Sequence, residues 1–169
     1  MRKLLFRHQA PASLAAAVKA GLGGMAGIAL LSLLASVTGI PWLVAPLGAS
    51  CVLLFAAPLV PFSQPVNLVA GHLLCSVIGL VVAAVAPTEA WSLGLAVGLS
   101  IAAMHFLRIT HPPAGADPIV ILMLRPGWDF LVFPMLAGCL VLLALTLALR
   151  VLPPRSVYPA PLPKGIDAV

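Results

Sequence analysis

Charge is scarce in this sequence. Only 8% of its 169 residues are charged, whereas 62% are hydrophobic and the mean hydropathy is +1.17. Soluble domains carry roughly 25% charged residues, so this chain has too few charges to cover a globular surface in water. The composition therefore excludes an ordinary soluble protein and predicts an all-α integral membrane protein.

Motifs for catalysis and metal binding are missing as well. We find no nucleophile–base pairing, P-loop or dinucleotide fingerprint, so we expect neither an enzyme nor a cofactor. The three cysteines lie in apolar stretches without CxxC or Cys/His spacing, which predicts small buried side chains. The spacing of His105, His111 and Asp117 fits no specific metal site.

The basic residues collect at the two ends of the chain. The positive-inside rule then predicts that both termini are cytoplasmic and that the number of crossings is even. We expect residues 1–18 and 151–169 to be cytoplasmic tails of a multi-pass protein, in a bacterial inner membrane, with no nucleic-acid partner. The second tail is rich in proline and is expected to be extended or disordered. The basic residues at the ends are Arg2, Lys3, Arg7, Lys19, Arg150, Arg155 and Lys164.

Long apolar runs are what the sequence has in abundance. Four are long enough to cross roughly 30 Å of hydrocarbon, at residues 19–40, 66–86, 90–107 and 130–149. Two shorter apolar stretches, 47–57 and 119–124, are each introduced by proline and glycine. Ten helical residues cover only about 15 Å, so these stretches are candidates for half-helices or for parts of broken helices.

The chain also repeats itself at a shift of 67 residues. Under this shift APLGASCVLLFA falls on PPAGADPIVILM, and VAGHLL then falls on LAGCLV without a gap. The repeat predicts two membrane units, 19–86 and 87–150, each with two spanning helices around a short segment. If the short segments are re-entrant, there are four full crossings, which we expect. If they cross, there are six crossings, arranged as inverted 3+3 repeats.

The two proline-glycine breaks are the predicted site. Non-helical backbone is tolerated at membrane depth only where protein or a water-filled cavity covers it, and transporters often bind solutes where two such breaks meet. Helix N-termini facing each other would favour an anion, although Asp117 would instead cap its helix or carry protons. The candidate substrate-binding residues are Pro46, Gly48, Ser50, Thr110, His111, Pro112, Pro113, Gly115 and Asp117.

A tenth candidate lies in the second long run. His72, Cys75, Ser76 and Gly79 have helical spacing and form one small polar stripe. A histidine inside a spanning helix either lines a cavity or makes an interhelical hydrogen bond, and the sequence does not separate the two. Two GxxxG pairs, Gly23–Gly27 and Gly94–Gly98, predict close helix packing within or between protomers.

These patterns support three functional hypotheses. The first is a permease or channel for a small anion. Its partners would be the lipid bilayer, the anion and, in a homo-oligomer, further copies of the chain. The second is a non-transporting module that assembles with or regulates a partner, which the lack of a polar cavity between the breaks would favour. The third is a channel for a small neutral solute, which needs no selectivity for charge.

Several motifs together resemble the HPP family of small integral membrane proteins. They are PLGASCVLLFAAP, QPVNLVAGHLL, THPPAGAD and GWDFLVFPMLAG, within residues 25–149, and His111, Pro112 and Pro113 form the His-Pro-Pro. The resemblance implies four transmembrane helices and, from chloroplast and cyanobacterial members, nitrite as substrate. Some bacterial members carry a regulatory CBS domain, which we do not expect in this sequence. The Asp117-Pro118 pair departs from the family pattern, where a small or hydroxyl residue is more common.

Overall fold

Prolines and one serine mark where several of the helices begin. Ser13 caps the first helix by accepting a hydrogen bond from the Ala16 amide, and proline occupies the first turn of the next three helical segments. The computed structural model describes residues 5–162, so Arg2, Lys3 and Lys164 lie outside the described part. The α-helices there are α1 (Leu14–Thr38), α2 (Ala45–Ala56), α3 (Pro65–Val85), α4 (Ala90–Phe106), α5 (Asp117–Leu124) and α6 (Ala137–Leu149).

Shorter helical turns connect these helices. They are η2 (Pro61–Ser63), η3 (Pro112–Ala116), η4 (Trp128–Leu131) and η5 (Val132–Leu136). Three helical stretches have the length and composition to cross a membrane: α1, α3 and the run Trp128–Leu149. The prediction of an all-α membrane protein is thus confirmed for the described residues.

Two predicted spans differ from the continuous long helices that we expected. The third is α4, whose 17 residues extend about 25 Å, somewhat short of a typical hydrocarbon core. The fourth is interrupted, because Phe133 has extended backbone angles and the proline that follows it cannot continue a regular helix. Only the 13 residues of α6 are regular α-helix in that run.

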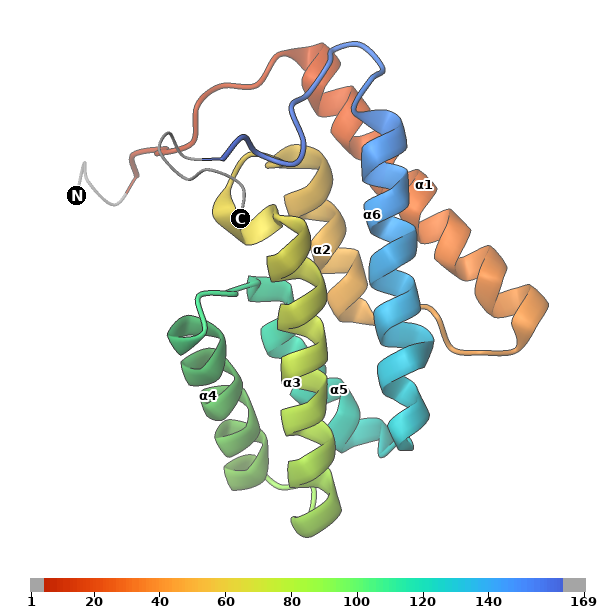
Figure 1. Cartoon of the computed structure of the whole chain (residues 1–169), viewed down its shortest axis with the longest axis vertical. Helices are drawn as coiled ribbons and strands as arrows, with labels where there is room; N and C mark the ends of the chain where they lie inside the picture. Colours follow the sequence, from red (N-terminus) through yellow and green to blue (C-terminus); the bar gives the residue numbers. More distant parts are fainter. Residues whose placement is uncertain (1–4, 163–169) are drawn as a thin grey trace.

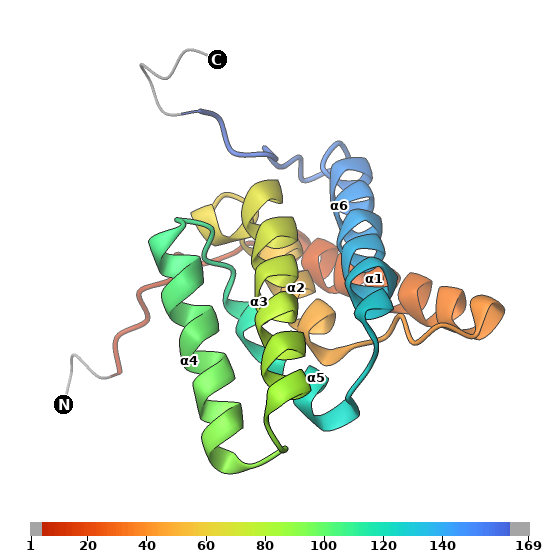
Figure 2. The same cartoon turned by 60° about the horizontal axis from the view of Figure 1, so that its bottom comes forward.

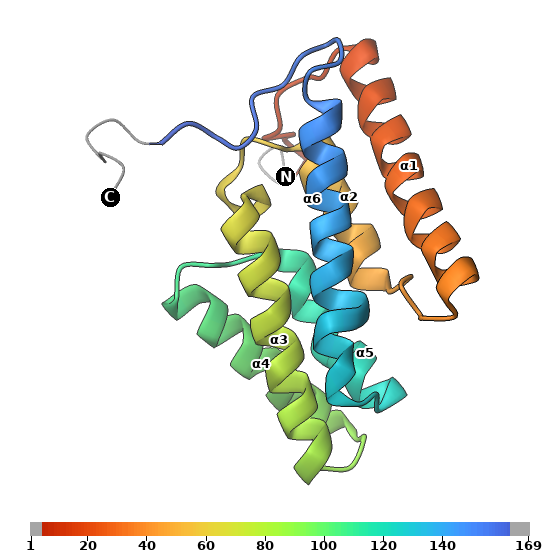
Figure 3. The same cartoon turned by 45° about the vertical axis from the view of Figure 1, so that its right-hand side comes forward.

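Helix α3 lies at the centre of the fold and packs against α4, α5 and α6 (Figure 1). Helix α1 lies at the edge, where it packs on α2 and α6, as Figure 3 shows most clearly. Successive helices run in alternating directions along the long axis of the molecule in Figures 1 and 3. The short segments α2 and η3–α5 follow this alternation and do not turn back toward the side from which they start.

The two short segments begin near each other in the interior. Helix α2 has 12 residues, and η3 with α5 contributes 5 and 8. Figure 2 shows η3 entering beside α2 and α3, with α5 continuing away from this point. The two short apolar stretches predicted from the sequence are therefore separate helical pieces whose starting ends are neighbours.

The GxxxG pairs have different surroundings. A Cβ atom on Gly23 would lie 2.8 Å from the Phe55 ring, and one on Gly27 would lie 3.0 Å from Leu142. These glycines therefore allow α1 to approach α2 and α6 closely within the protomer. A Cβ on Gly94 or Gly98 would meet nothing within 4 Å, so this second pair faces outward on α4.

The C-terminal segment, which we expected to be extended or disordered, has no helix or strand over residues 151–162 and is tied to the helical body by side-chain contacts. Tyr158 is 1% exposed, and its hydroxyl donates to the Ser63 carbonyl at 2.9 Å. Burial raises the pKa of this hydroxyl to about 12. The Lys19 ammonium donates to the carbonyls of Leu152 and Pro154, each at 2.7 Å. These bonds hold the segment against α1 and η2.

Candidate functional site

The two proline-glycine breaks line one surface hollow. Its volume is about 610 Å³, and both the start of α2 and η3 contribute to its walls. We call it the inter-break hollow. Its lining residues are Ala45, Pro46, Ala49, Val52, Leu53, Pro112, Pro113 and Ala116.

The side chains of the inter-break hollow are all apolar. Pro112 and Pro113 also lack backbone N–H groups, so the start of η3 offers few donors to an anion. This differs from the sequence-based picture of two helix N-termini presenting free N–H groups to a shared polar cavity. The polar side chains of the breaks lie elsewhere.

Four polar side chains form one hydrogen-bonded chain in the interior. The Ser50 hydroxyl lies 2.8 Å from His72 Nε2 and 2.8 Å from His111 Nε2. His72 Nδ1 lies 2.8 Å from Asp117 Oδ2, and His111 Nδ1 donates to the Phe62 carbonyl at 2.6 Å. We call Ser50, His72, His111 and Asp117 the buried network, because all four are 0% exposed.

The buried network has a few further contacts. Ser50 Oγ also lies within hydrogen-bond distance of the Pro46 carbonyl, at 3.1 Å. Ser76 donates to Asp117 Oδ2 at 3.4 Å, and the two histidine rings have centroids 4.9 Å apart. The other carboxylate oxygen, Asp117 Oδ1, is buried without a hydrogen-bond partner in the described part of the chain.

Asp117 is the electrostatic centre of this arrangement. It starts α5, where a carboxylate interacts favourably with the positive end of the helix dipole. A buried carboxylate is nevertheless costly unless it is paired, and His72 is the ionisable group that contacts it directly. Asp117 thus occupies the place at the start of α5 where we had considered an anion.

Glycines on α3 allow the second break to pack closely against this helix. A Cβ on Gly71 would lie 2.8 Å from His111 Cβ, and one on Gly79 would lie 2.9 Å from Pro118 Cα. Real Cβ atoms do not approach so closely, so these positions require glycine for this packing. The predicted stripe of His72, Cys75, Ser76 and Gly79 is buried along its whole length.

The predicted site residues fall into three groups. Ser50, His72, His111 and Asp117 are brought together in the buried network, whereas Pro46, Pro112 and Pro113 line the inter-break hollow. Thr110 and Gly115 line a second hollow of about 420 Å³ on the α4 side, which Pro112 also borders. Gly48 lines neither hollow and instead faces α1, because a Cβ on it would meet Ile28 Cδ1 at 3.7 Å.

Sequence reasoning did not assign three groups that contact the site. Ser76 was placed on the stripe but not among the candidate site residues. The Phe62 carbonyl was missed, since a backbone acceptor leaves no mark in a side-chain pattern. The Asn67 side chain holds the second break by donating to the Thr110 carbonyl at 2.9 Å.

The three cysteines lie where the apolar stretches predicted them. Cys51, Cys75 and Cys139 are free thiols and are buried, as predicted. Within residues 5–162, no group of three or more histidine, cysteine or acidic residues has the geometry to hold a metal ion.

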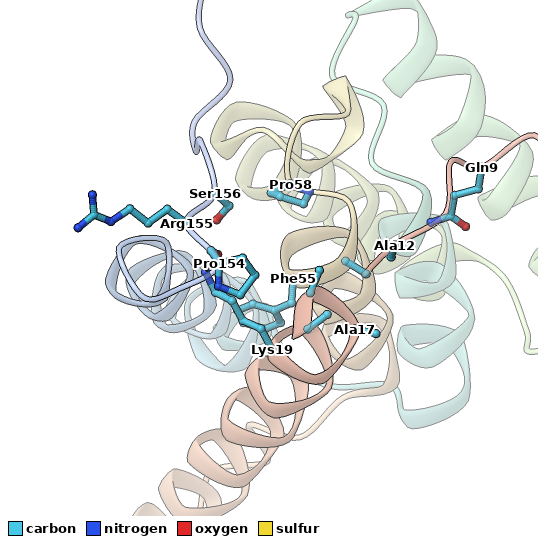
Figure 4. A pocket seen from close by; sticks show the side chains of 12 residues that line it. Gln9, Ala12, Ala17, Lys19, Phe55, Pro58, Pro154, Arg155 and Ser156 are labelled. Atoms are coloured by element: carbon cyan, nitrogen blue, oxygen red, sulfur yellow. Dashed lines mark hydrogen bonds between the residues drawn. The ribbon is translucent and has the colours of Figure 1, made fainter. Parts of the chain in front are cut away.

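A third hollow lies near the chain termini, between α1, α2 and the C-terminal segment. Its volume is about 430 Å³, and it includes two basic residues, Lys19 and Arg155. The Lys19 ammonium is occupied by two backbone carbonyls, and Figure 4 shows the Arg155 side chain extending away from the other lining residues. The basic groups of this hollow are therefore not arranged around a common anion position.

Comparison with known proteins identifies the family of this membrane chain. Residues 9–159 match the family described as HPP, transmembrane region. The chain belongs to the HPP transmembrane family. This HPP chain contains the His-Pro-Pro as His111, Pro112 and Pro113, so the histidine of that motif is a member of the buried network.

Two transmembrane proteins of Dictyostelium discoideum are similar to this HPP chain. One is 33% identical over 127 residues, covering 70% of this chain and 40% of the relative. The other is 35% identical over 125 residues, covering 69% of this chain and 44% of the relative. The chain thus matches less than half the length of these relatives. No solved structure matches it.

Proposed function

We propose that this HPP chain is a permease for a small inorganic anion, with nitrite as the specific candidate substrate. The observation that carries the proposal is the buried network, in which both breaks and α3 contribute polar side chains to one interior point. It is neither an enzyme nor cofactor-dependent in this proposal. The bilayer and the transported anion are its partners.

The physical basis is the cost of keeping such a network in an apolar protein. Ionisable residues inside spanning segments are rare and by default mark solute or proton pathways. Here two histidines and an aspartate are fully buried at the point where two helix breaks meet. Broken helices meeting in the interior are the arrangement around which many transporters build their sites.

The apolar lining of the inter-break hollow supports a closed conformation of such a permease. Pro46, Ala49, Pro112 and Pro113 line the hollow while the network is fully buried, so in this proposal a solute reaches the network only after the breaks move. The outer side chains thus act as a hydrophobic barrier in this proposal, and the histidines form the site behind it.

The proposal includes six crossing segments arranged as inverted repeats, the alternative to four crossings. The alternating helix directions support it (Figure 1). So does a pair of related contacts: a Cβ on Gly71 would meet His111 of the second break, and a Cβ on Gly138, 67 residues later, would meet Leu47 of the first. Each unit's third helix thus packs on the other unit's break, as expected of two interlocked repeats.

Anion uptake into proteoliposomes tests the proposal. Nitrite and nitrate uptake is compared between vesicles with the wild-type protein and protein-free vesicles, because nitrous acid crosses lipid unaided. His111→Ala removes a network member, and Gly115→Leu fills the second hollow, where a Cβ meets nothing within 4 Å. His8→Ala is the matched control, since His8 is exposed ahead of α1 and lines none of these hollows.

We expect facilitated uptake that falls more than tenfold in His111→Ala, decreases in Gly115→Leu and is unchanged in His8→Ala. Equal flux in all four proteins would contradict the assignment of the site. If neither nitrite nor nitrate is taken up, the proposed substrate class is wrong. Equal facilitated flux of a neutral solute such as urea would favour the neutral-solute channel.

The apolar inter-break hollow also favours the second hypothesis, a membrane module that assembles with another protein or with copies of itself. The outward-facing Gly94–Gly98 pair on α4 is suited to close contact between helices of two protomers. The mass of the complex in nanodiscs distinguishes the assembly module from the permease. It is measured for the wild type, for Gly94→Leu and Gly98→Leu, and for Gly21→Leu as the control. An oligomer that these two substitutions dissociate, without any anion flux, would support the assembly module.

A further inference from the structure

We propose that the buried network holds one exchangeable proton, shared among Asp117, His72 and His111, and that the anion crosses together with this proton. The inference rests on the proposed permease function for its second half only. The first half, the bound proton, follows from counting hydrogens in the network.

The count begins at the Phe62 carbonyl, which can only accept a hydrogen bond. His111 Nδ1 therefore carries a hydrogen. Three further contacts complete the chain: His111 Nε2 to Ser50, Ser50 to His72 Nε2, and His72 Nδ1 to Asp117. Each of these contacts needs one hydrogen between its two heavy atoms, so the chain of four contacts needs four hydrogens.

The side chains in their ordinary neutral-pH forms provide one hydrogen too few. Two neutral histidines carry one ring hydrogen each, the Ser50 hydroxyl carries one, and an ionised Asp117 carries none. With three hydrogens, one contact would press two acceptor atoms together at 2.8 Å or less. The Pro46 carbonyl adds a further acceptor for the Ser50 hydrogen and makes the shortage larger.

One added proton removes this conflict wherever it resides. On His72 it gives an imidazolium that donates to both Asp117 and Ser50. On Asp117 it gives a carboxylic acid that donates to His72, whose Nε2 hydrogen then serves Ser50. On His111 it gives an imidazolium that donates to both Phe62 and Ser50, while Ser50 donates to His72. The proton belongs to the network rather than to one residue.

The added proton also makes the buried network neutral overall. Without it, a carboxylate would remain in the interior with Oδ1 unpartnered. The Ser76 hydroxyl also contacts Asp117, and the buried thiols of Cys75 and Cys139 are near enough to interact with its charge. No lysine or arginine in the described part of the chain hydrogen-bonds to the network, so a proton is the cation available to it.

The shared proton explains why an acidic residue, Asp117, lies in the proposed path of an anion. An ionised Asp117 repels an approaching anion, whereas the protonated network presents ring and hydroxyl hydrogens to it. Anion entry therefore requires a proton taken from water on one side, which returns to water on the other side with the anion. One anion and one proton cross together, and the step moves no net charge.

Asp117→Asn is the decisive variant. The asparagine amide has nearly the shape of the carboxyl group and can donate its own hydrogen to His72 Nδ1. It therefore supplies the fourth hydrogen without binding a proton. We expect the variant to fold with an intact network that no longer titrates.

Nuclear magnetic resonance of the whole chain in nanodiscs tests the bound proton without any transport. His8→Gln and His105→Gln, both exposed positions, leave ring-nitrogen signals from His72 and His111 alone. At pH 7 we expect either one imidazolium ring or a protonated aspartic acid carboxyl, and loss of that signal in Asp117→Asn. Two neutral rings beside an ionised Asp117, or identical spectra with and without the carboxyl, would overturn the proposal.

Flux measurements test the coupling. With the membrane potential clamped at zero, a tenfold inward proton gradient should raise the initial rate of nitrite uptake in wild-type vesicles above the rate in protein-free vesicles, where diffusion of nitrous acid alone leads to the same final accumulation. Asp117→Asn should lose this response. Wild-type flux that follows voltage and ignores the pH gradient would overturn coupling. If no flux occurs, the permease proposal fails, and the resonance experiment still decides whether the proton is bound.

Discussion

His72 Nδ1 lies 2.8 Å from Asp117 Oδ2 across the contact between α3 and α5, and both side chains are fully buried. The two residues are 45 positions apart in the chain, so their meeting is a product of the tertiary fold. This pair links the central helix α3 to the second helix break. Any movement of the break relative to α3 must therefore lengthen the contact between His72 and Asp117.

Removing the carboxyl group without a replacement should destabilise the protein strongly. Asp117→Ala leaves His72 without its partner, and breaking a buried ion pair costs about 3–5 kcal/mol. Asp117→Asn should cost much less, because the amide preserves the contact. Thermal unfolding of both variants in the same detergent measures the difference. Equal unfolding temperatures for the two variants would contradict the pairing.

The close approach of α3 to the second break predicts a steric effect at Gly71. Gly71→Ala places a Cβ 2.8 Å from His111 Cβ and should cost about 1–3 kcal/mol, besides displacing the His111 ring from Ser50. Gly24→Ala is the control, because a Cβ there meets nothing within 4 Å. Thermal unfolding again provides the measurement, and a Gly71 variant as stable as the Gly24 variant would argue against this packing.

Arg125 stabilises the turn between α3 and α4 from the end of α5. Its guanidinium donates to the carbonyls of Ala83 and Ala86 and to the Thr88 hydroxyl, at distances of 2.7 to 3.1 Å. Arg125→Met should therefore cost about 1.5–3 kcal/mol, the usual value for hydrogen bonds to a charged group. Arg155→Met, on the exposed C-terminal segment, should change stability little; a similar loss in both variants would contradict the role of Arg125.

The crossing number predicts which loops share a side of the membrane. Six crossings place Leu59 and Arg108 on the side of the termini and Trp128 on the opposite side, whereas four crossings place all three opposite the termini. Cysteines at these exposed positions, with Val157→Cys as a terminal reference, can be labelled in intact vesicles with an impermeant maleimide. The three native cysteines are buried, so their background labelling should be low.

We expect Leu59→Cys and Arg108→Cys to label together with Val157→Cys, and Trp128→Cys to label only from the other side. Labelling of Leu59→Cys, Arg108→Cys and Trp128→Cys from one common side would instead support four crossings with re-entrant short segments.

Much of the site could be predicted because its residues contrast with their surroundings. Proline disfavours continuation of a helix from the preceding turn, so the breaks before Ser50 and at His111 were visible as local signals. A histidine in a long apolar run, such as His72, is rare, so the sequence alone marked it as a candidate. The 67-residue repeat then suggested that the two breaks belong together.

The contacts of the site could not be read from the sequence. Which face of α3 meets which break depends on packing between distant segments, and the Phe62 carbonyl is a backbone atom without a residue signature. The apolar hollow at the breaks was also unexpected, because Pro112 and Pro113 line it while His111 is buried in the network. The interruption at Phe133 was missed, since hydropathy does not distinguish a continuous helix from a bent one.

The central claim is that the buried network is the transport site, and Ser50→Ala tests it most directly. Ser50 bridges the two histidines, and alanine removes the bridging hydroxyl with the smallest change in shape. The measurement is the initial rate of nitrite uptake into proteoliposomes, after checking that the variant unfolds at nearly the wild-type temperature. We predict a loss of at least tenfold relative to wild type, with His8→Ala unchanged; wild-type rates in Ser50→Ala would contradict the claim.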